Sequence, residues 1–416
     1  MSKTLTESRS AALASTKKLQ IALLGTSEHE GQMCGRAFEI LDAKPIYLDP
    51  SNPILPSKPV PDAVVLSREW NIDIRRAAIA ARRQGIPVVY IMDGVIEWDY
   101  FWHNWEYIKP EGTVLQPLIA SDLCVIGQHP ARVLAALGLA EKIHIVGLPR
   151  LDGLKRRRVV DRDLPRQIII ATAKTFGHNI AHKVYVRAAL RDLKRWFDGH
   201  PGIVPAWRIS EEVAGELGVV ASTGGTICDA LEMASGVISF TSTVLLEAMR
   251  IGIPTAQIDY RAVPQYVQTA WEIRNPEQIE SVIQELLYPP AEKLAYQEIC
   301  LNDELEPGNA SKRLAEVIRS SVETLSVRDC EAPTRFHGAV DFRQVNSHLS
   351  AFSVAPLSRL QYELDATYKL WERDRQRLGV IADLRVDPVV RAILALGWLP
   401  GLRRLARLMR SLLAKG

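Results

Sequence analysis

The sequence has few cysteines, no long uncharged apolar run and almost no net charge. Its 416 residues include five cysteines, an odd number scattered without a Cys-x-x-Cys pair, which argues against a disulfide framework or a zinc site and favours buried thiols in a reducing compartment. No uncharged apolar stretch approaches the roughly 20 residues that a membrane-spanning helix needs. A formal net charge of +3 produces no field of the kind that nucleic-acid binders use, so no nucleic-acid partner is expected.

Signals for export and for metal binding are also missing. Residues 1–17 are polar and contain no apolar core of a signal peptide, so we expect a mobile leader rather than an export signal. His178 and His182 are spaced i, i+4 but have no third partner, and no Asp-x-Asp pair ends a strand. These absences predict a protein without metal or cofactor, located in the cytoplasm or peripherally at the inner membrane.

Short apolar, β-branched runs alternate with helical patterns along most of the chain. Runs such as KLQIALLG (18–25), IPVVYIM (86–92) and QIIIATA (167–173) contain consecutive apolar residues, not apolar residues at alternate positions. Continuous apolar runs are typical of strands that are covered on both faces, as in a parallel sheet with helical crossovers. The charged segment KRRRVVDRDLPR (155–166) interrupts this alternation and predicts a linker between two domains.

These patterns predict an α/β fold of two Rossmann-like doubly wound domains facing a cleft, with a C-terminal helical extension. One large Rossmann-type domain is the alternative. Because ligands of open α/β sheets bind at the carboxyl ends of the strands, the cleft is the expected site. The expected parts are a mobile leader (1–17), a first Rossmann-like domain (18–154), a linker (155–166), a second Rossmann-like domain (167–325), helical after about residue 264, and a helical extension (326–416).

The stretch GVISFTSTVLLEAMRIGIPTAQIDY (236–260) carries the strongest functional pattern. A buried strand ends in hydroxyl residues that include Ser242 and Thr243, and a helix is predicted to begin there. Hydroxyl side chains cap the free amides of a helix start, and the same amides and the positive end of the helix dipole bind anions. Glu247 lies one turn into this helix, where a carboxylate can accept hydrogen bonds from vicinal ribose hydroxyls.

Three further groups follow predicted strands of the second domain and could contact a bound anion through an amide, a hydroxyl or a cation. They are Lys174 with Thr175, Arg208, and the loop Gly224, Gly225 and Thr226. Adjacent glycines let backbone amides approach a ligand closely, although a plain turn is the alternative. A lysine can stabilise a departing phosphate. For Arg208 the alternative is an ion pair with Glu211 or Glu212.

In the first domain, the segment IMDGVIEWDYFWHNWEY (91–107) combines carboxylates with aromatic rings. Asp93 ends a buried strand, Glu97 follows four residues later, and several rings surround His103. Sugar faces stack on rings while carboxylates bind hydroxyls, and two carboxylates suit glycosyl transfer, one for the acceptor hydroxyl and one for developing charge. The alternative is a Trp-rich loop that seals the domain interface.

The run STVLLEAMRIGIPTA (242–256) resembles the donor-nucleotide motif of GT-B-fold glycosyltransferases and related nucleotide-sugar epimerases. The strand-Asp-Gly-x-x-Glu-Trp arrangement is similar to that of bacterial surface-polysaccharide glycosyltransferases, including capsule and lipopolysaccharide enzymes that use CMP-activated sugars such as Kdo or sialic acid. The resemblance implies that Ser242 and Thr243 bind the donor phosphate and Glu247 the ribose. It also implies that Asp93 is the catalytic carboxylate and Glu97 the second one.

The expected function is therefore that of a glycosyltransferase, which moves a sugar from a nucleotide-sugar donor to a surface-polysaccharide or lipid-linked acceptor without a metal. Two alternatives on the same fold are a nucleotide-sugar 2-epimerase and a transferase of polyol phosphate from a CDP donor. A further alternative is a non-catalytic nucleotide-sugar-binding protein of an assembly pathway.

The C-terminal segment 387–416 is basic and amphipathic. One predicted helical face carries Leu402, Leu405, Met409 and Leu412, while Arg403, Arg407 and Arg410 lie largely opposite. Such a helix suits the interface of an anionic membrane, where it would bring the protein to a lipid-linked acceptor. The alternative is a helix packed across the two domains with a solvated basic face.

Overall fold

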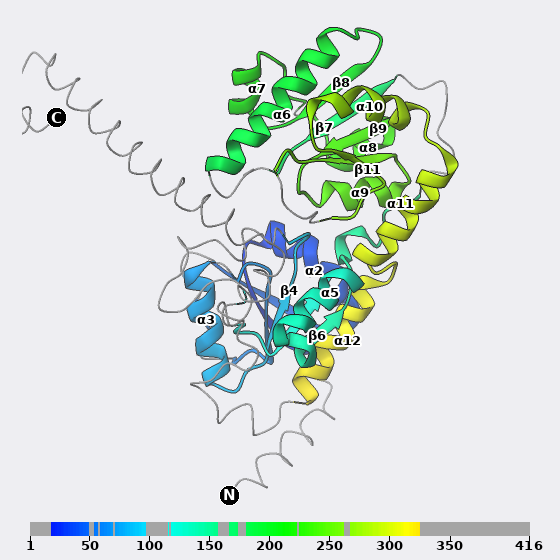
Figure 1. Cartoon of the computed structure of the whole chain (residues 1–416). Helices are drawn as coiled ribbons and strands as arrows, with labels where there is room; N and C mark the ends of the chain where they lie inside the picture. The colour runs from blue at the N-terminus through cyan, green and yellow to red at the C-terminus, as the bar shows by residue number, and fades with distance from the viewer. Residues whose placement is uncertain are drawn as a thin grey trace, which may run out of the picture. The chain divides into compact units, whose positions relative to one another are not determined.

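The computed structural model of the chain describes two parallel α/β sheets and the helices that cover them (Figure 1). Apart from Ile180 and Ala181, the described residues lie in one compact unit of the chain. None of the described helices is long and apolar enough to cross a membrane. The described residues are 18–49, 54–56, 59–69, 71–96, 115, 118–156, 166–173, 180–222, 224–261 and 267–324.

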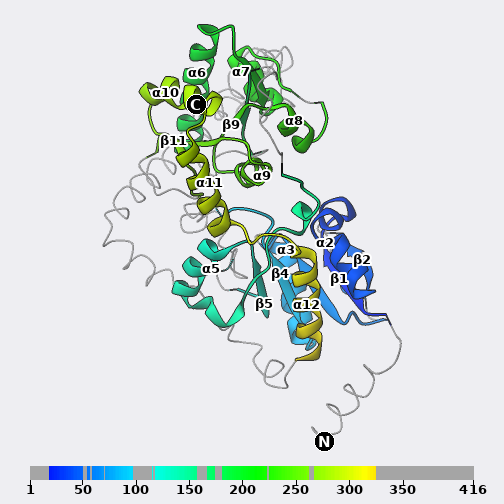
Figure 2. The same ribbon diagram turned by 90° about the vertical axis from the view of Figure 1, so that its right-hand side faces the viewer.

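The first sheet has six parallel strands in the order β2-β1-β3-β4-β5-β6. Strands β3 and β4 are buried along their whole length, as their continuous apolar runs predict for a sheet covered on both faces. Helices α3 and α12 lie on opposite sides of this sheet (Figures 1 and 2). The strands are β1 (Gln20–Leu24), β2 (Lys44–Leu48), β3 (Ala63–Leu66), β4 (Val88–Ile91), β5 (Asp122–Val125) and β6 (Ile143–Ile145).

Three of the described helices connect strands of the first sheet. The Arg- and Ala-rich run 72–83 predicts a helix, and α3 (Ile72–Arg83) has these bounds; it begins after Asn71, whose side chain accepts hydrogen bonds from the first turn. The sequence also predicts a helix over 35–43, but α2 (Ser27–Leu41) begins eight residues earlier, because Thr26 caps it by accepting from His29 N. Helix α5 (Gln128–Leu134) follows β5 and continues into a π-helical turn (Ala135–Leu139).

The second sheet has five parallel strands in the order β11-β10-β9-β7-β8. Alternate side chains of β7 enter different cores: Ile168 and Ile170 pack with α6 and α10, whereas Ile169 packs with α8 and α9. This two-sided burial explains why the strand is apolar throughout. The elements are β7 (Gln167–Ala171), α6 (Ile180–Asp198), β8 (Val204–Arg208), α7 (Glu211–Leu217), α8 (Ile227–Met233), β9 (Gly236–Ser239), α9 (Val244–Ile251), β10 (Thr255–Ile258), β11 (Trp271–Ile273) and α10 (Ile279–Leu287).

Two sequence-based predictions for the second sheet are wrong in detail. The short apolar run at 219–221 predicts a strand, but the structure has only an isolated bridge between Trp207 and Ala221 there. The segment after residue 264 is not helical throughout, because β11 pairs with β10 at the sheet edge. Three residues are too short a run for hydrophobic periodicity to separate a strand from a helix.

The last two described helices return the chain to the first sheet. Helix α11 (Ala291–Glu304) leads to α12 (Ala310–Glu323), and α12 packs beside α2. Leu314 and Ile318 of α12 belong to the core of the first sheet. The second predicted domain, with its expected end at 325, therefore sends its final helix across to the first.

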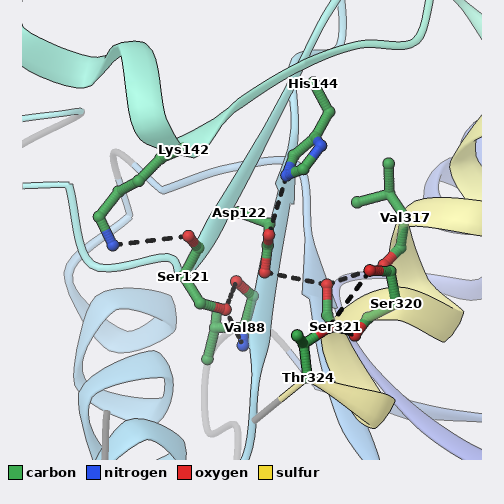
Figure 3. Close-up of polar contacts among 9 residues, drawn as sticks. All are labelled: Val88, Ser121, Asp122, Lys142, His144, Val317, Ser320, Ser321 and Thr324. Carbon is green, nitrogen blue, oxygen red and sulfur yellow. Dashed lines mark hydrogen bonds and ion pairs between the residues drawn. The ribbon is translucent and has the colours of Figure 1, made fainter. Parts of the chain in front are cut away.

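Polar contacts fix both ends of α12. The carboxylate of Asp152 accepts from the backbone amides of Ala310 and Ser311, both at 2.8 Å, and so caps its first turn. Near its end, Ser321 Oγ donates to Asp122 Oδ2 at 2.9 Å, and His144 Nε2 lies 2.9 Å from Asp122 Oδ1 (Figure 3). Burial would raise the pKa of Asp122, but these hydrogen bonds hold it below its ordinary value. The charged carboxylate therefore stabilises the attachment of α12.

Candidate functional site

The predicted phosphate-binding turn lies between β9 and α9. Ser242 Oγ accepts from Val244 N at 3.4 Å, and Ser242 O accepts from Leu245 N at 3.1 Å. These amides therefore already have partners inside the turn. Thr243 occupies the N-cap position but its side chain makes no capping hydrogen bond. The Thr243 hydroxyl is thus the group of this turn best placed to meet a ligand.

The predicted catalytic segment of the first domain reaches this same turn. Gly94 follows Asp93 just after β4, and a Cβ atom built on Gly94 would lie 2.0 Å from Thr243 Oγ1. No side chain fits there, so the backbone after Asp93 directly approaches the Thr243 hydroxyl. Two segments that the sequence singled out independently are brought together by the fold.

Asp93 is exposed to solvent, yet the surrounding protein changes its acidity. Nearby protein atoms displace part of the water around the Asp93 carboxyl and so raise its pKa. The charges of His29, Arg150 and Arg68 lower this pKa by smaller amounts. An exposed carboxylate with a raised pKa is a better proton acceptor than an ordinary aspartate.

Glu247 is buried and faces the first domain. Its Oε1 accepts from Arg150 Nη2 at 2.9 Å, and its Oε2 has no hydrogen-bond partner among the described residues. Burial raises the pKa of Glu247, and the charge of Arg150 lowers it in part. The carboxylate predicted to bind ribose thus has one oxygen paired with Arg150 and one buried oxygen without a hydrogen-bond partner among the described residues.

Arg150 is a site residue that the sequence analysis did not find. It follows β6 in a short 3₁₀ turn, Pro149–Leu151, and its charge acts on Asp93 as well as on Glu247. A signal was present, because an arginine placed after a strand lies at the edge of the sheet where α/β proteins bind ligands.

Glu30 is a second carboxyl group near Asp93 that the sequence analysis missed. It is fully buried, and its Oε1 accepts from Ser67 Oγ at 2.7 Å while Oε2 has no partner among the described residues. Its side chain packs over Gly25, where a Cβ would lie 2.2 Å from Glu30 Oε1. Burial is the main reason that the pKa of Glu30 rises to about 7, and the negative charge of Asp93 contributes. No pattern in the sequence distinguishes this glutamate from others in the first turn of a helix.

Arg208 organises the glycine loop. Its Nη1 donates to Ser222 O at 2.7 Å and to Gly224 O at 2.8 Å, and its Nη2 donates to Gly225 O at 3.1 Å. These contacts differ from the alternative pairing with Glu211 or Glu212, and the predicted role of Arg208 at a ligand phosphate stays a prediction. The guanidinium is used to hold the loop carbonyls.

The loop ends in a capped helix. Gly225 has a φ of +68°, a left-handed conformation that favours glycine. Thr226 forms a capping box with Asp229 at the start of α8, since each side chain accepts from the backbone amide of the other. The Thr226 hydroxyl is therefore engaged in capping, which leaves the glycine amides as the groups for a ligand.

Several predicted site residues lie outside the described part of the chain. These are Glu97, Lys174 and Thr175, as well as the basic C-terminal helix. Within the described residues, no group of three His, Cys, Asp or Glu side chains is arranged to hold a metal ion.

Solved structures with the same architecture have been compared with this chain. UDP-GlcNAc 2-epimerase of Methanocaldococcus jannaschii, in complex with UDP-GlcNAc and UDP, superimposes with a TM-score of 0.51 at 16% identity, over 73% of this chain and 99% of the other. MnaA of S. aureus, in a structure with UDP, gives 0.50 at 13% identity, over 73% and 96%. The chain has a GT-B-like fold. No protein-family model and no curated protein matches its sequence.

The GT-B-like fold assigns the candidate residues to two Rossmann domains. Asp93 and Arg150 follow strands of the first, and Thr243 and Glu247 belong to the second. Identities of 13% and 16% establish a shared fold alone, so the chemistry of the site has to come from its own residues.

Proposed function

We propose that this protein is a GT-B enzyme that transfers a sugar from a nucleotide-sugar donor to a hydroxyl of a surface-polysaccharide or lipid-linked acceptor. The observation that carries the proposal is the close approach of Gly94 to Thr243. It brings the residue that follows Asp93 against the turn that we propose holds the donor phosphate. In this proposal the donor carbon and the acceptor hydroxyl react between Asp93 and that turn.

The residues suit a direct transfer. Thr243, and with it Ser242, would hydrogen-bond the phosphate next to the sugar, and Arg150 would offset the charge that develops as the nucleotide departs. Asp93 would accept the proton of the acceptor hydroxyl as the new glycosidic bond forms. Glu247 would bind the ribose hydroxyls through Oε2, with Arg150 holding Oε1 in place.

A nucleotide-sugar 2-epimerase is the second candidate, because a structure of similar fold bears that name and holds UDP-GlcNAc and UDP. An epimerase acts on the donor alone, so it needs no acceptor. The same nucleotide-binding residues would serve a transferase of polyol phosphate from a CDP donor or a non-catalytic binding protein. Turnover experiments separate these activities.

The test begins with binding of CMP, CDP and UDP, measured as a shift in the thermal unfolding of the full chain. Sugar nucleotides of the base that binds are then followed for donor hydrolysis, for epimerisation and for transfer to glycan or lipid-linked acceptors. We expect Asp93→Asn to lower hydrolysis and transfer by about 10²-fold or more with nucleotide affinity unchanged.

The matched control is Asp42→Asn, an exposed aspartate of the same domain that pairs with Lys18 at the end of α2. Equal turnover by wild type and Asp93→Asn would refute the catalytic assignment. Formation of a 2-epimer without acceptor would establish the second candidate. Tight nucleotide binding with no turnover of any kind would establish a binding protein.

A membrane-bound acceptor and attachment through the basic C-terminal helix are part of this proposal. The helix lies outside the described residues, so its role stays a prediction from the pattern of leucines and arginines alone. The binding experiment also identifies the nucleotide of the donor, with CMP among the candidates.

A further inference from the structure

Arg68 is a charged group at the edge of the first sheet that has no ion-pair partner among the described residues. It follows Ser67 at the end of β3 and is partly exposed. Ser67, the residue before it, donates to Glu30 Oε1 at 2.7 Å, and β3 pairs with β4, after which Asp93 follows. The charge of Arg68 lowers the pKa of both Asp93 and Glu30. A guanidinium remains charged at every physiological pH and offers planar pairs of donors that match carboxylate and phosphate oxygens.

The order of strands places Arg68 on one side of Asp93, and Arg150 with the residues proposed to bind the donor nucleotide on the other. Strand β3 neighbours β4 on the side away from β5 and β6, at a spacing of about 4.8 Å between strands. The contact of Arg150 with Glu247 comes from the end of β6. Arg68 and Arg150 therefore flank Asp93 from opposite directions, and among the described contacts Arg150 binds Glu247 of the second domain whereas Arg68 has no such ion pair.

Charges of both signs lie on the side of Arg68, since Glu28 shares the first turn of α2 with His29 and Glu30. His29, in the first turn of α2 after β1, is a further basic group whose charge acts on Asp93. Glu30 lies behind them, but it is fully buried and holds a proton through much of the range below pH 7. Arg68 is partly exposed and has no ion pair among the described residues, so its guanidinium can meet an anion that comes from outside the protein.

We propose that the acceptor carries an anionic group, a phosphate or a carboxylate, near the hydroxyl that receives the sugar, and that Arg68 binds this group on the β3 side of Asp93. The inference rests on the proposed function. An acceptor held by its anion on Arg68 would present its neighbouring hydroxyl to the Asp93 carboxylate, opposite the donor.

Three matched probes test the inference: methyl glucoside, methyl glucuronide and methyl glucoside 6-phosphate. Each is titrated calorimetrically into the full-length protein saturated with the nucleotide that binds, and into the nucleotide-free protein. We expect at least one charged probe to bind about tenfold tighter than the neutral one. The glucuronide and the 6-phosphate distinguish a carboxylate-bearing from a phosphate-bearing acceptor.

The variants are Arg68→Gln and Arg68→Lys, with Arg83→Gln as the matched control. Arg83 is an exposed arginine of the same domain in the last turn of α3, before the strand β4 begins. Arg68→Gln should abolish the difference between charged and neutral probes, Arg68→Lys should retain part of it, and Arg83→Gln should retain all of it. Nucleotide affinity should be unchanged in all three, and circular dichroism reports whether each is folded.

Three results would overturn the inference. The neutral probe could bind as tightly as the charged ones, no charged probe could bind, or Arg68→Gln could reduce nucleotide affinity while the probe difference persists. The last result would reassign Arg68 to the donor phosphate. Failure of the proposed function would be seen separately, as absence of nucleotide binding or of Asp93-dependent turnover, and the nucleotide-free titrations would still decide whether Arg68 binds anions.

Discussion

Gly94 lies against Thr243 so closely that a methyl group at position 94 would come within 2.0 Å of Thr243 Oγ1. This contact joins the segment after β4 to the start of α9 and leaves no space between them for a side chain. The absence of a side chain at position 94 is therefore a requirement of the site.

Replacing Gly94 by alanine should impair turnover. The added methyl group must displace Thr243 or push the Asp93 segment away, and misplacement of reacting groups by about 1 Å can cost 10²-fold in rate. We expect Gly94→Ala to lower kcat/KM for donor turnover at least about tenfold. Gly153→Ala is the control, because a Cβ there meets nothing within 4 Å. Equal rates for both variants would contradict the role of the contact.

The pair of Glu247 and Arg150 should govern nucleotide affinity. Glu247→Gln keeps the volume of the side chain but weakens a charge-assisted hydrogen bond and the proposed contacts with ribose. We expect the Kd for the nucleotide to rise about tenfold or more, measured by calorimetry, with the protein still folded.

Glu298 offers a matched control for this prediction, since it forms a bidentate pair with a different arginine, Arg156, at 2.7 and 2.9 Å. Glu298→Gln should leave the Kd unchanged. A folded Glu247→Gln variant with wild-type affinity would remove the ribose assignment and leave the pair as a structural link.

Removing the guanidinium of Arg208 should loosen the glycine loop. Three carbonyl oxygens lose their donor in Arg208→Ala, so the loop amides are no longer held for a ligand. We expect weaker nucleotide binding together with a lower melting temperature. Arg187→Ala, which breaks the surface pair with Glu216 in the same domain, should change stability by less than about 1 kcal/mol and binding not at all. Unaltered binding in Arg208→Ala would show that the loop does not touch the nucleotide.

Glu30 should make the stability of the protein fall as the pH rises. Its pKa is about 7 in the folded protein against an ordinary value of 4.5, so the folded state binds this proton more tightly than the unfolded state. The destabilisation is absent below about pH 4.5, grows as the pH rises from there, and is complete above pH 7, where it reaches about 3 kcal/mol.

Glu30→Gln removes this ionisation, so the free energy of unfolding in urea should decline less between pH 5 and pH 8 than it does in the wild type. Glu39→Gln, on the exposed side of the same helix, should follow the wild type. Parallel pH dependences for Glu30→Gln and wild type would mean that Glu30 is ionised without cost inside the fold.

The sequence predicts the fold well where the pattern is local and long. Continuous apolar runs such as Ala63–Leu66 predict strands covered on both faces, and the capped helix Ile72–Arg83 has the expected bounds. The start of α2 was missed because Gly31 and Gly35 interrupt its apolar pattern, although Thr26 provides a cap. The short edge strand β11 has too few residues to show a period.

The candidate site is predictable only in part, because contacts between distant segments decide it. The patterns around Asp93 and Thr243 are local, but nothing in either segment tells that the two touch. Arg150 becomes a site residue through Glu247, which lies far along the chain. Arg208 follows a strand, as a phosphate-binding arginine would. The structure, but not the sequence, shows that its guanidinium donates to carbonyl oxygens of the glycine loop.

Helix α12 has a practical consequence for dissecting the protein. Its Leu314 and Ile318 fill the core beside the first sheet, and Asp152 and Asp122 hold its two ends. A fragment that ends at the linker would expose to water the apolar surface that α12 covers. A fragment that begins at the linker would contain α12 without the sheet against which it packs. Both fragments are therefore expected to aggregate, and expressing the first domain alone requires α12 to be fused to it.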